Sequence, residues 1–166
     1  MQQIDVSDLI GQPGSSRTVS LDEPVGGLEL ELARIRGDVP IRGELLLESV
    51  VEGILVSGRI EGEVSLSCAR CLTTFGGRVG VDVGELFVVG AAPGDDEYAL
   101  DPAGSIDPEP MVRDAVMLEL PFSPLCRPDC RGLCERCGRD RNTGACTCAP
   151  RSADPRWAAL EEIRFD

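Results

Sequence analysis

The clearest pattern along the chain is an alternation of apolar and polar positions between residues 54 and 68. One parity carries apolar residues or glycine and ends at Cys68, whereas the other carries serine, arginine and glutamate from Ser57 onward. Alternation of this kind is the period of a strand with one buried face. Cys71 follows at once, and the pattern then predicts a second strand and a long hairpin with the two cysteines at its tip. The second strand is marked by Phe75, Val79, Val81, Val83, Phe87 and Val89.

Weaker patterns flank this hairpin. The apolar residues between positions 4 and 10 predict a short strand, followed by a loop. Leu28, Leu30 and Leu32 alternate with glutamates and predict one further strand, with a change of parity before Ile35. Residues 90–109 mix glycine, proline and acidic residues without any period, which predicts a mobile acidic loop.

Two short helices are predicted in the second half of the chain. Asp107 and Pro108 are typical of a helix start, and Pro121 ends the apolar pattern that follows. Asp154 and Pro155 open a second amphipathic segment. The apolar residues of these two helices are Met111, Val112, Ala115, Val116, Leu118 and Leu120 in the first, and Trp157, Leu160 and Ile163 in the second.

These patterns predict an α+β fold. We expect a mainly antiparallel β domain with a long hairpin, two short helices and a C-terminal cysteine-rich zinc-binding segment. The boundary is placed so that residues 1–125 form the β-rich domain with one helix. Residues 126–166 then form the cysteine cluster and the C-terminal helix, packed on the first part.

Cysteine chemistry dominates the second of these parts. Six of the eight cysteines lie between residues 126 and 148, among glycine, proline and aspartate. Such a segment buries too little apolar surface to order itself, so a cross-link is needed. Pairs of cysteines two residues apart are typical of zinc knuckles, and eight thiolates suffice for two zinc ions. The candidate ligands are Cys68, Cys71, Cys126, Cys130, Cys134, Cys137, Cys146 and Cys148.

The spacing leaves two partitions of these cysteines open. The favoured one joins Cys134, Cys137, Cys146 and Cys148 on one ion, which leaves the other four to meet across the fold. The rival places Cys126, Cys130, Cys134 and Cys137 on one ion and the remaining four cysteines on the other. Disulfides are less favoured in a reducing cytoplasm. A redox dithiol at Cys68 and Cys71, or an iron–sulfur cluster, stays an alternative.

The charge pattern restricts the function further. The 166 residues carry a formal net charge of −13, and all 16 basic residues are arginine, because lysine and histidine are absent. Histidine bases, Schiff-base lysines and Walker A lysines are therefore excluded, so we expect no enzyme. Residues 126–151 contain six arginines and three acidic residues, a balance of +3 that leaves −16 for the rest. The candidate RNA-contacting residues are Arg127, Arg131, Arg136, Arg139 and Arg141, although arginines that merely offset the acidic body explain the pattern equally well.

No stretch of the sequence approaches the ~18 apolar residues of a membrane span, and its beginning has no signal-peptide pattern. We therefore expect a cytoplasmic protein with neither a membrane partner nor DNA as a partner. The acidic body would repel nucleic acid in general, so any RNA contact must be local and oriented.

Several distinctive motifs lie between residue 68 and the end of the chain. They are CARCL at 68–72, LPFSPLC at 120–126, CRPDCRGLCERCG at 126–138 with Asn142 and CTC beyond it, and DPRWAAL at 154–160. Together these motifs resemble the YceD family of large ribosomal RNA subunit accumulation proteins. Arg141 departs from the pattern, where an apolar residue is expected. The resemblance implies a non-enzymatic factor for 23S rRNA accumulation or maturation and large-subunit assembly. It also implies a 23S rRNA precursor or pre-50S particle as partner. An alternative is an adaptor that docks a basic ribosomal protein or assembly factor without touching RNA.

Overall fold

The computed structural model describes residues 1–90, 97–144, 146–148 and 156. Within them the chain forms eight strands and one helix. In chain order these are β1 (Ile4–Asp5), β2 (Ser16–Glu23), β3 (Ala33–Ile35), β4 (Ile41–Ser49), β5 (Ile54–Ser67), β6 (Thr74–Val89), β7 (Tyr98–Asp101), β8 (Ser105–Ile106) and α1 (Glu109–Glu119). Within the described part of the chain no helix has the length and apolar character to cross a bilayer.

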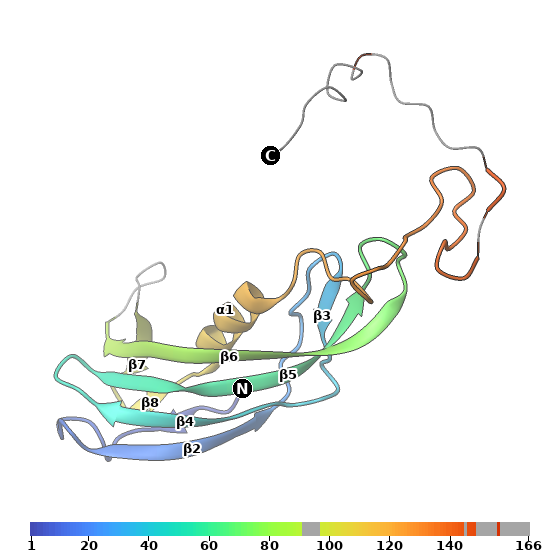
Figure 1. Cartoon of the computed structure of the whole chain (residues 1–166). Helices are drawn as coiled ribbons and strands as arrows, with labels where there is room; N and C mark the ends of the chain where they lie inside the picture. The colour runs from blue at the N-terminus through green and yellow to red at the C-terminus, as the bar shows by residue number, and fades with distance from the viewer. Residues whose placement is uncertain (91–96, 145, 149–155, 157–166) are drawn as a thin grey trace.

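The strands join in one curved sheet. Their order is β1-β8-β7-β6-β5-β4-β2, with β3 pairing to β5 beside this path. Figure 1 shows the curvature of the sheet and α1 packed near β6. Met111, Val112 and Val116 of α1 are buried in the same apolar core as the strands. The prediction of a mainly antiparallel β domain is therefore confirmed, with only the pairing of β6 and β7 being parallel among the described strands.

The strands β5 and β6 lie at the centre of this sheet. They pair in antiparallel fashion from Ile54 opposite Phe87 to Ser67 opposite Thr74. Their buried residues follow the period of two, because alternate side chains point to the core. Each strand also has a second neighbour, β4 beside β5 and β7 beside β6. Residues 68–73 are left as a connection that projects beyond the ladder.

The sequence pattern missed β2, where it predicted a loop, and β4, and it misread the chain between them. Leu28, Leu30 and Leu32 do not lie on one strand. Instead, Leu30 N–H donates to the Ala33 carbonyl at 2.7 Å and Ile35 N–H to the Leu28 carbonyl at 2.9 Å, which closes a tight turn. The change of parity before Ile35 was the sign of this turn. The following strand β4 alternates as well, with Ile41, Leu45 and Leu47 buried.

The predicted loop at 90–109 is also corrected. Tyr98–Asp101 forms β7 beside β6, and Ser105–Ile106 forms β8 between β7 and β1. Leu100 and Ile106 are buried, so two isolated apolar residues suffice to anchor short strands that carry no periodic signal.

The first predicted helix is present as α1. Pro108 precedes it, and the carboxylate of Asp107 accepts a hydrogen bond from the Glu109 amide at 2.9 Å. Leu118, which was expected on the buried side, is 86% exposed, because it lies on the outer face of α1. The second predicted helix, with Trp157, Leu160 and Ile163, lies outside the described residues.

Candidate metal centres

The structure gathers the eight cysteines into two groups of four. The clip site consists of Cys68, Cys71, Cys126 and Cys130, and the loop site of Cys134, Cys137, Cys146 and Cys148. Within each group all Sγ atoms lie within 4.8 Å of one another. The grouping matches the favoured partition and not its rival. Whether the thiols hold an ion stays a prediction.

The clip site joins segments that are far apart in the sequence. Cys68 and Cys71 lie in the connection between β5 and β6, and Cys126 and Cys130 follow α1. The Ala69 N–H donates to the Pro124 carbonyl at 2.8 Å, which holds the two segments together. Three of the four cysteines are buried, and Cys126 is exposed. The site therefore lies at the edge of the core rather than on a free loop.

Sulfur spacing in the clip site fits one tetrahedral ion. The Sγ atoms of Cys68 and Cys130 are 3.7 Å apart, and those of Cys71 and Cys126 are also 3.7 Å apart. A tetrahedral ion with metal–sulfur distances of about 2.3 Å separates its sulfurs by roughly 3.8 Å. An iron–sulfur cluster distributes its thiolates over several irons and so needs a wider arrangement. The donor set therefore fits a single thiophilic ion.

Both sites contain the same turn. In the clip site, Leu72 N–H donates to the Cys68 carbonyl at 2.9 Å, and in the loop site Gly138 N–H donates to the Cys134 carbonyl at 2.8 Å. The residue after each second cysteine has a left-handed backbone, with φ of 59° at Leu72 and 67° at Gly138. Glycine adopts this conformation without cost, whereas leucine does not. The turn of the clip site therefore places a leucine, Leu72, in a backbone conformation that is unfavourable for it.

Backbone amides lower the pKa of one thiol in each site. The amide of Cys126 is the main cause that lowers the pKa of Cys68 to about 6. The amide of Cys137 is the main cause that lowers the pKa of Cys134 to about 6. N–H groups that point at a sulfur favour the thiolate, which is the form that binds metal.

Other thiols shift in the opposite direction. Burial, together with the neighbouring thiols, raises the pKa of Cys126 to about 12. A hydrogen bond with Cys137, together with burial, raises the pKa of Cys148 to about 12. Four thiolates packed this closely repel one another, so they ionise together only with a cation between them.

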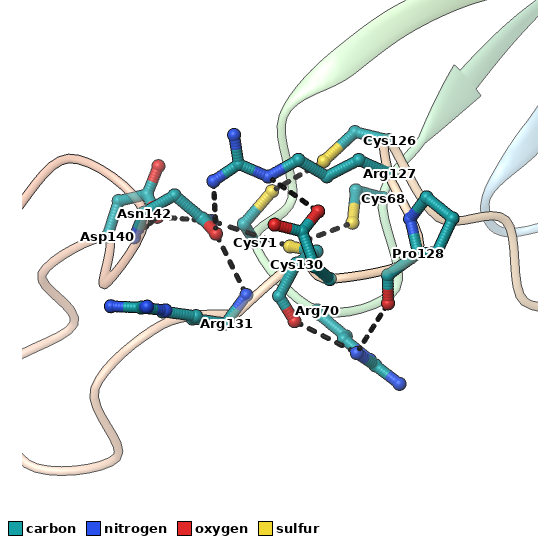
Figure 2. A network of polar contacts seen from close by, with 11 residues as sticks. Cys68, Arg70, Cys71, Cys126, Arg127, Pro128, Cys130, Arg131, Asp140 and Asn142 are labelled. Atoms are coloured by element: carbon teal, nitrogen blue, oxygen red, sulfur yellow. Dashed lines mark hydrogen bonds and ion pairs between the residues drawn. The ribbon is translucent and has the colours of Figure 1, made fainter.

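A hydrogen-bond network connects the hairpin tip to the segment that carries the loop site. Arg70 donates from one guanidinium nitrogen to the carbonyl oxygens of Cys130, at 2.9 Å, and Pro128, at 3.5 Å, as Figure 2 shows. The Leu133 N–H donates to the Arg70 carbonyl at 3.1 Å. Gly132, the residue before Leu133, has a φ of 67°, and a Cβ at this position would lie 3.0 Å from the Arg70 carbonyl oxygen. A glycine is therefore required where the two segments meet.

The loop site closes over a short stretch of chain. The Cys134 N–H donates to the Arg139 carbonyl at 2.8 Å, and Arg141 N–H donates to the Gly132 carbonyl at 2.9 Å. Leu133 and Asp140 form an isolated antiparallel bridge across this turn. Cys137 is exposed and the other three cysteines are half-buried. Little apolar burial supports this site, so backbone hydrogen bonds and its thiols hold it.

The candidate arginines divide into two kinds. Arg127 is engaged, because it donates to the Asn142 side chain at 2.8 Å and lies 3.5 Å from the carboxylate of Asp129. The others are exposed, and the described part of the chain offers their side chains no recorded hydrogen bond or ion pair. They are Arg131, Arg136, Arg139 and Arg141.

Two residues with a role at the sites escaped the sequence reasoning. The sequence reasoning gave Arg70 no structural role, yet Arg70 ties the hairpin tip to Cys130. Asn142 was noted only as part of a motif, yet its side chain reaches the sulfur of Cys130 at 3.4 Å. No periodic pattern in the sequence predicts either contact, because both depend on how two loops meet in space.

Comparison with known proteins gives a consistent result. The model of the family described as large ribosomal RNA subunit accumulation protein YceD matches residues 56–164. An uncharacterized protein of Mycobacterium tuberculosis (strain ATCC 25618 / H37Rv) is 38% identical over 96% of this chain and 80% of its own length. One of Mycobacterium leprae (strain TN) is 35% identical over 96% of this chain and 76% of its own.

A chloroplast protein adds a named relative. The large ribosomal RNA subunit accumulation protein YCED homolog 1 of Zea mays is 44% identical over 48 residues, which are 28% of this chain and 16% of its own. No solved structure matches this chain. The span matched by the family model contains all eight cysteines of both candidate sites.

Proposed function

The chain belongs to the YceD family of large ribosomal RNA subunit accumulation proteins, and from this premise we propose that it is a non-enzymatic factor for large-subunit assembly. It acts in the cytoplasm on 23S rRNA or on a particle that contains its precursor. The family assignment carries this proposal. The absence of lysine and histidine from the sequence agrees with it, because most bases and nucleophile activators are missing.

Each four-cysteine group holds one zinc ion in this proposal. The support is the donor set, four thiols within 4.8 Å in each group, and the pair distances of 3.7 Å in the clip site. Zinc supplies no redox chemistry, so its contribution is to fix the fold of the segment that follows α1. Cys68, Cys71, Cys126 and Cys130 hold that segment on the hairpin, and the remaining four cysteines hold its outer turn.

The exposed arginines of this segment are the proposed RNA contacts. Three of them, Arg131, Arg136 and Arg139, lie in or beside the turn that carries the loop site. A guanidinium presents a planar fork of donors that matches a phosphate. With a balance of +3 on residues 126–151 and −16 elsewhere, only one side of such a protein suits RNA. Contact is therefore local, and the acidic body faces away from the RNA or toward basic proteins.

A deletion strain tests the functional proposal. Without the protein, 23S rRNA levels should fall and large subunits should be depleted in sucrose gradients, and the wild-type gene should restore both. The tagged protein should migrate with precursor particles. Normal 23S rRNA in the deletion strain would contradict the proposal. Co-migration with particles together with no binding to free precursor RNA would favour the adaptor alternative instead.

A further inference from the structure

One side chain of the loop-site segment reaches into the clip site. Asn142 lies in sequence between Cys137 and Cys146, both members of the loop site. Its Nδ2 nevertheless donates to the Sγ of Cys130, a member of the clip site, at 3.4 Å. Figure 2 shows Asn142 beside Cys130 and Arg131. Asn142 therefore lies in the loop-site segment of the chain, but its side chain contacts a cysteine of the clip site.

Three further contacts fix the orientation of this amide. Its Oδ1 accepts from the Arg131 N–H at 2.8 Å and from the Arg127 guanidinium at 2.8 Å. Its Nδ2 also donates to the carboxylate of Asp140 at 2.6 Å. A reversed amide would place NH₂ against two donors, so the N–H groups must point toward Asp140 and the sulfur.

The turn of the loop site sets the position of Asn142. Two backbone hydrogen bonds close that turn, from Cys134 to Arg139 and from Arg141 to Gly132, and Asn142 is the next residue. The Asn142 N–H donates to the Asp140 carboxylate at 2.8 Å, which continues the turn. Any loosening at Cys134 or Cys137 therefore displaces the amide that contacts Cys130.

We infer that Asn142 is a positioning residue shared by both sites, so that an ion in the loop site strengthens the hold of the clip site on its own ion. The inference rests on the metal sites of the proposed function, but not on RNA contact. An N–H that donates to a thiolate stabilises its charge and fixes its direction toward the metal. Loss of such an outer partner typically costs 10–100-fold in metal affinity. Coupling between two sites is reciprocal, so clip-site loss also weakens the loop site.

Metal-release kinetics provide the test. Zinc-loaded protein is mixed with a chromophoric chelator, and the release phases are compared for wild type, Asn142→Ala and Asn142→Asp. Both variants should release one of the two ions about 10–100-fold faster, since neither retains the N–H donor. Asn142→Asp preserves the oxygen that accepts from Arg131 and Arg127, so it separates the contacts of the amide N–H groups, to Cys130 and Asp140, from those of the amide oxygen. Thr143→Ala is the control, because its hydroxyl lies in the same turn without contacting a sulfur.

A spectroscopic readout distinguishes positioning from a loss of folding. In cobalt-substituted protein, loss of an N–H···S bond should move part of the thiolate-to-metal charge-transfer absorption to longer wavelength. In the Cys146→Ser/Cys148→Ser protein, the remaining ion should already leave faster, and adding Asn142→Ala should change its rate little. The coupling would be overturned if the Asn142 variants release both ions at the wild-type rates. It would also be overturned if Asn142→Ala accelerates release by the same factor with and without Cys146→Ser/Cys148→Ser. A wild-type protein that binds no zinc would instead refute the metal sites themselves and the coupling with them.

Discussion

The clip site and the loop site use the same turn in different surroundings. In the clip site the cysteines come from two segments 55 to 62 residues apart, and three of the four are buried. In the loop site they come from residues 134–148, and none is buried. Closing a loop about four times longer costs roughly 1.2 kcal/mol more in chain entropy. From this difference we propose that the clip site secures the fold and the loop site shapes a surface.

Packing strengthens this contrast. Phe75 packs against the buried cysteines of the clip site and also against the main apolar core. If the clip site holds an ion as proposed, losing it should therefore destabilise the β domain. Among the described residues, the turn of the loop site meets the rest of the protein through backbone hydrogen bonds, through Asn142 and through Leu133. Leu133 packs against the clip-site cysteines but not against the main apolar core. Variants of the two sites should therefore differ most in the free energy of unfolding of the β domain.

The largest effect is expected from Cys68→Ser/Cys71→Ser. An ion present at ~1,000 times its dissociation constant contributes about 4.1 kcal/mol to the folded state. Losing it should lower the melting temperature by about 10 °C, since 1 kcal/mol corresponds to about 2–4 °C at this size. Calorimetry of the zinc-loaded proteins measures this. A melting temperature within 2 °C of wild type would show that the clip site does not secure the fold.

A smaller effect of opposite sign is expected at the hairpin tip. Leu72 has a φ of 59° and is 61% exposed. Its left-handed backbone costs about 1–2 kcal/mol, and glycine removes this cost but adds ~0.4–1 kcal/mol of unfolded-state entropy. Leu72→Gly should therefore stabilise the protein by about 0.5–1 kcal/mol in denaturant titration. A destabilised variant would mean that the leucine side chain contributes contacts beyond those seen here. Gly138→Leu is the converse change and should destabilise the loop turn.

Cys146→Ser/Cys148→Ser should change the unfolding of the β domain less than the clip-site variant does. The loop site contributes little burial, so its loss reaches the β domain through the weakened clip-site ion. A tenfold weaker ion should lower the melting temperature by about 3–5 °C. Hydrogen exchange should nevertheless accelerate strongly between residues 132 and 144, because the turn loses its cross-link. If exchange rises equally in β5 and β6, the two sites form one cooperative unit and the contrast fails.

The smallest effect on stability belongs to Arg131→Gln/Arg136→Gln/Arg139→Gln. Exposed charges carry little folding energy, so unfolding should change by less than about 0.5 kcal/mol. Binding to large-subunit precursor RNA should weaken, and its logarithmic salt dependence should flatten by about one unit for each lost phosphate contact.

A matched control separates local contact from net charge. Arg34→Gln/Arg42→Gln/Arg59→Gln makes the same change in charge on the β domain, where each of these arginines forms an ion pair on the surface. This control should bind precursor RNA like wild type. Equal losses in both triple variants would show that overall charge, and not the arginine-bearing loop, governs the interaction.

Periodic positions account for most of what the sequence predicted. The alternation of residues 54–67 and 75–89 foretold β5 and β6, because the buried residues of each strand share one parity. Val89, at the end of β6, is the exception and is 60% exposed. The apolar pattern and Pro108 foretold α1 in the same way. The prediction that Leu118 is buried was wrong, because the hydrophobicity of a residue does not indicate whether another element covers it. Short strands such as β7 and β8 failed because two or four residues cannot show a period.

The candidate sites were predictable as residue types but only partly as contacts. Spacing favoured the observed grouping of cysteines, since four of them form a local set and the rest must then meet. The positions of Arg70 and Asn142 depend on the meeting of two loops, which no local pattern encodes. Gly132 is a local sign of this meeting of loops, because a glycine often marks a place where another backbone comes close. Here the backbone of Arg70 lies against it.

Metal content tests the central claim of two separate four-thiolate sites most directly. Native mass spectrometry should show two zinc ions on the wild-type chain, one on Cys68→Ser/Cys71→Ser and one on Cys146→Ser/Cys148→Ser. Elemental analysis of the same samples identifies the metal. Fewer than one ion on the wild-type chain, iron in place of zinc, or loss of both ions from either variant would contradict the account.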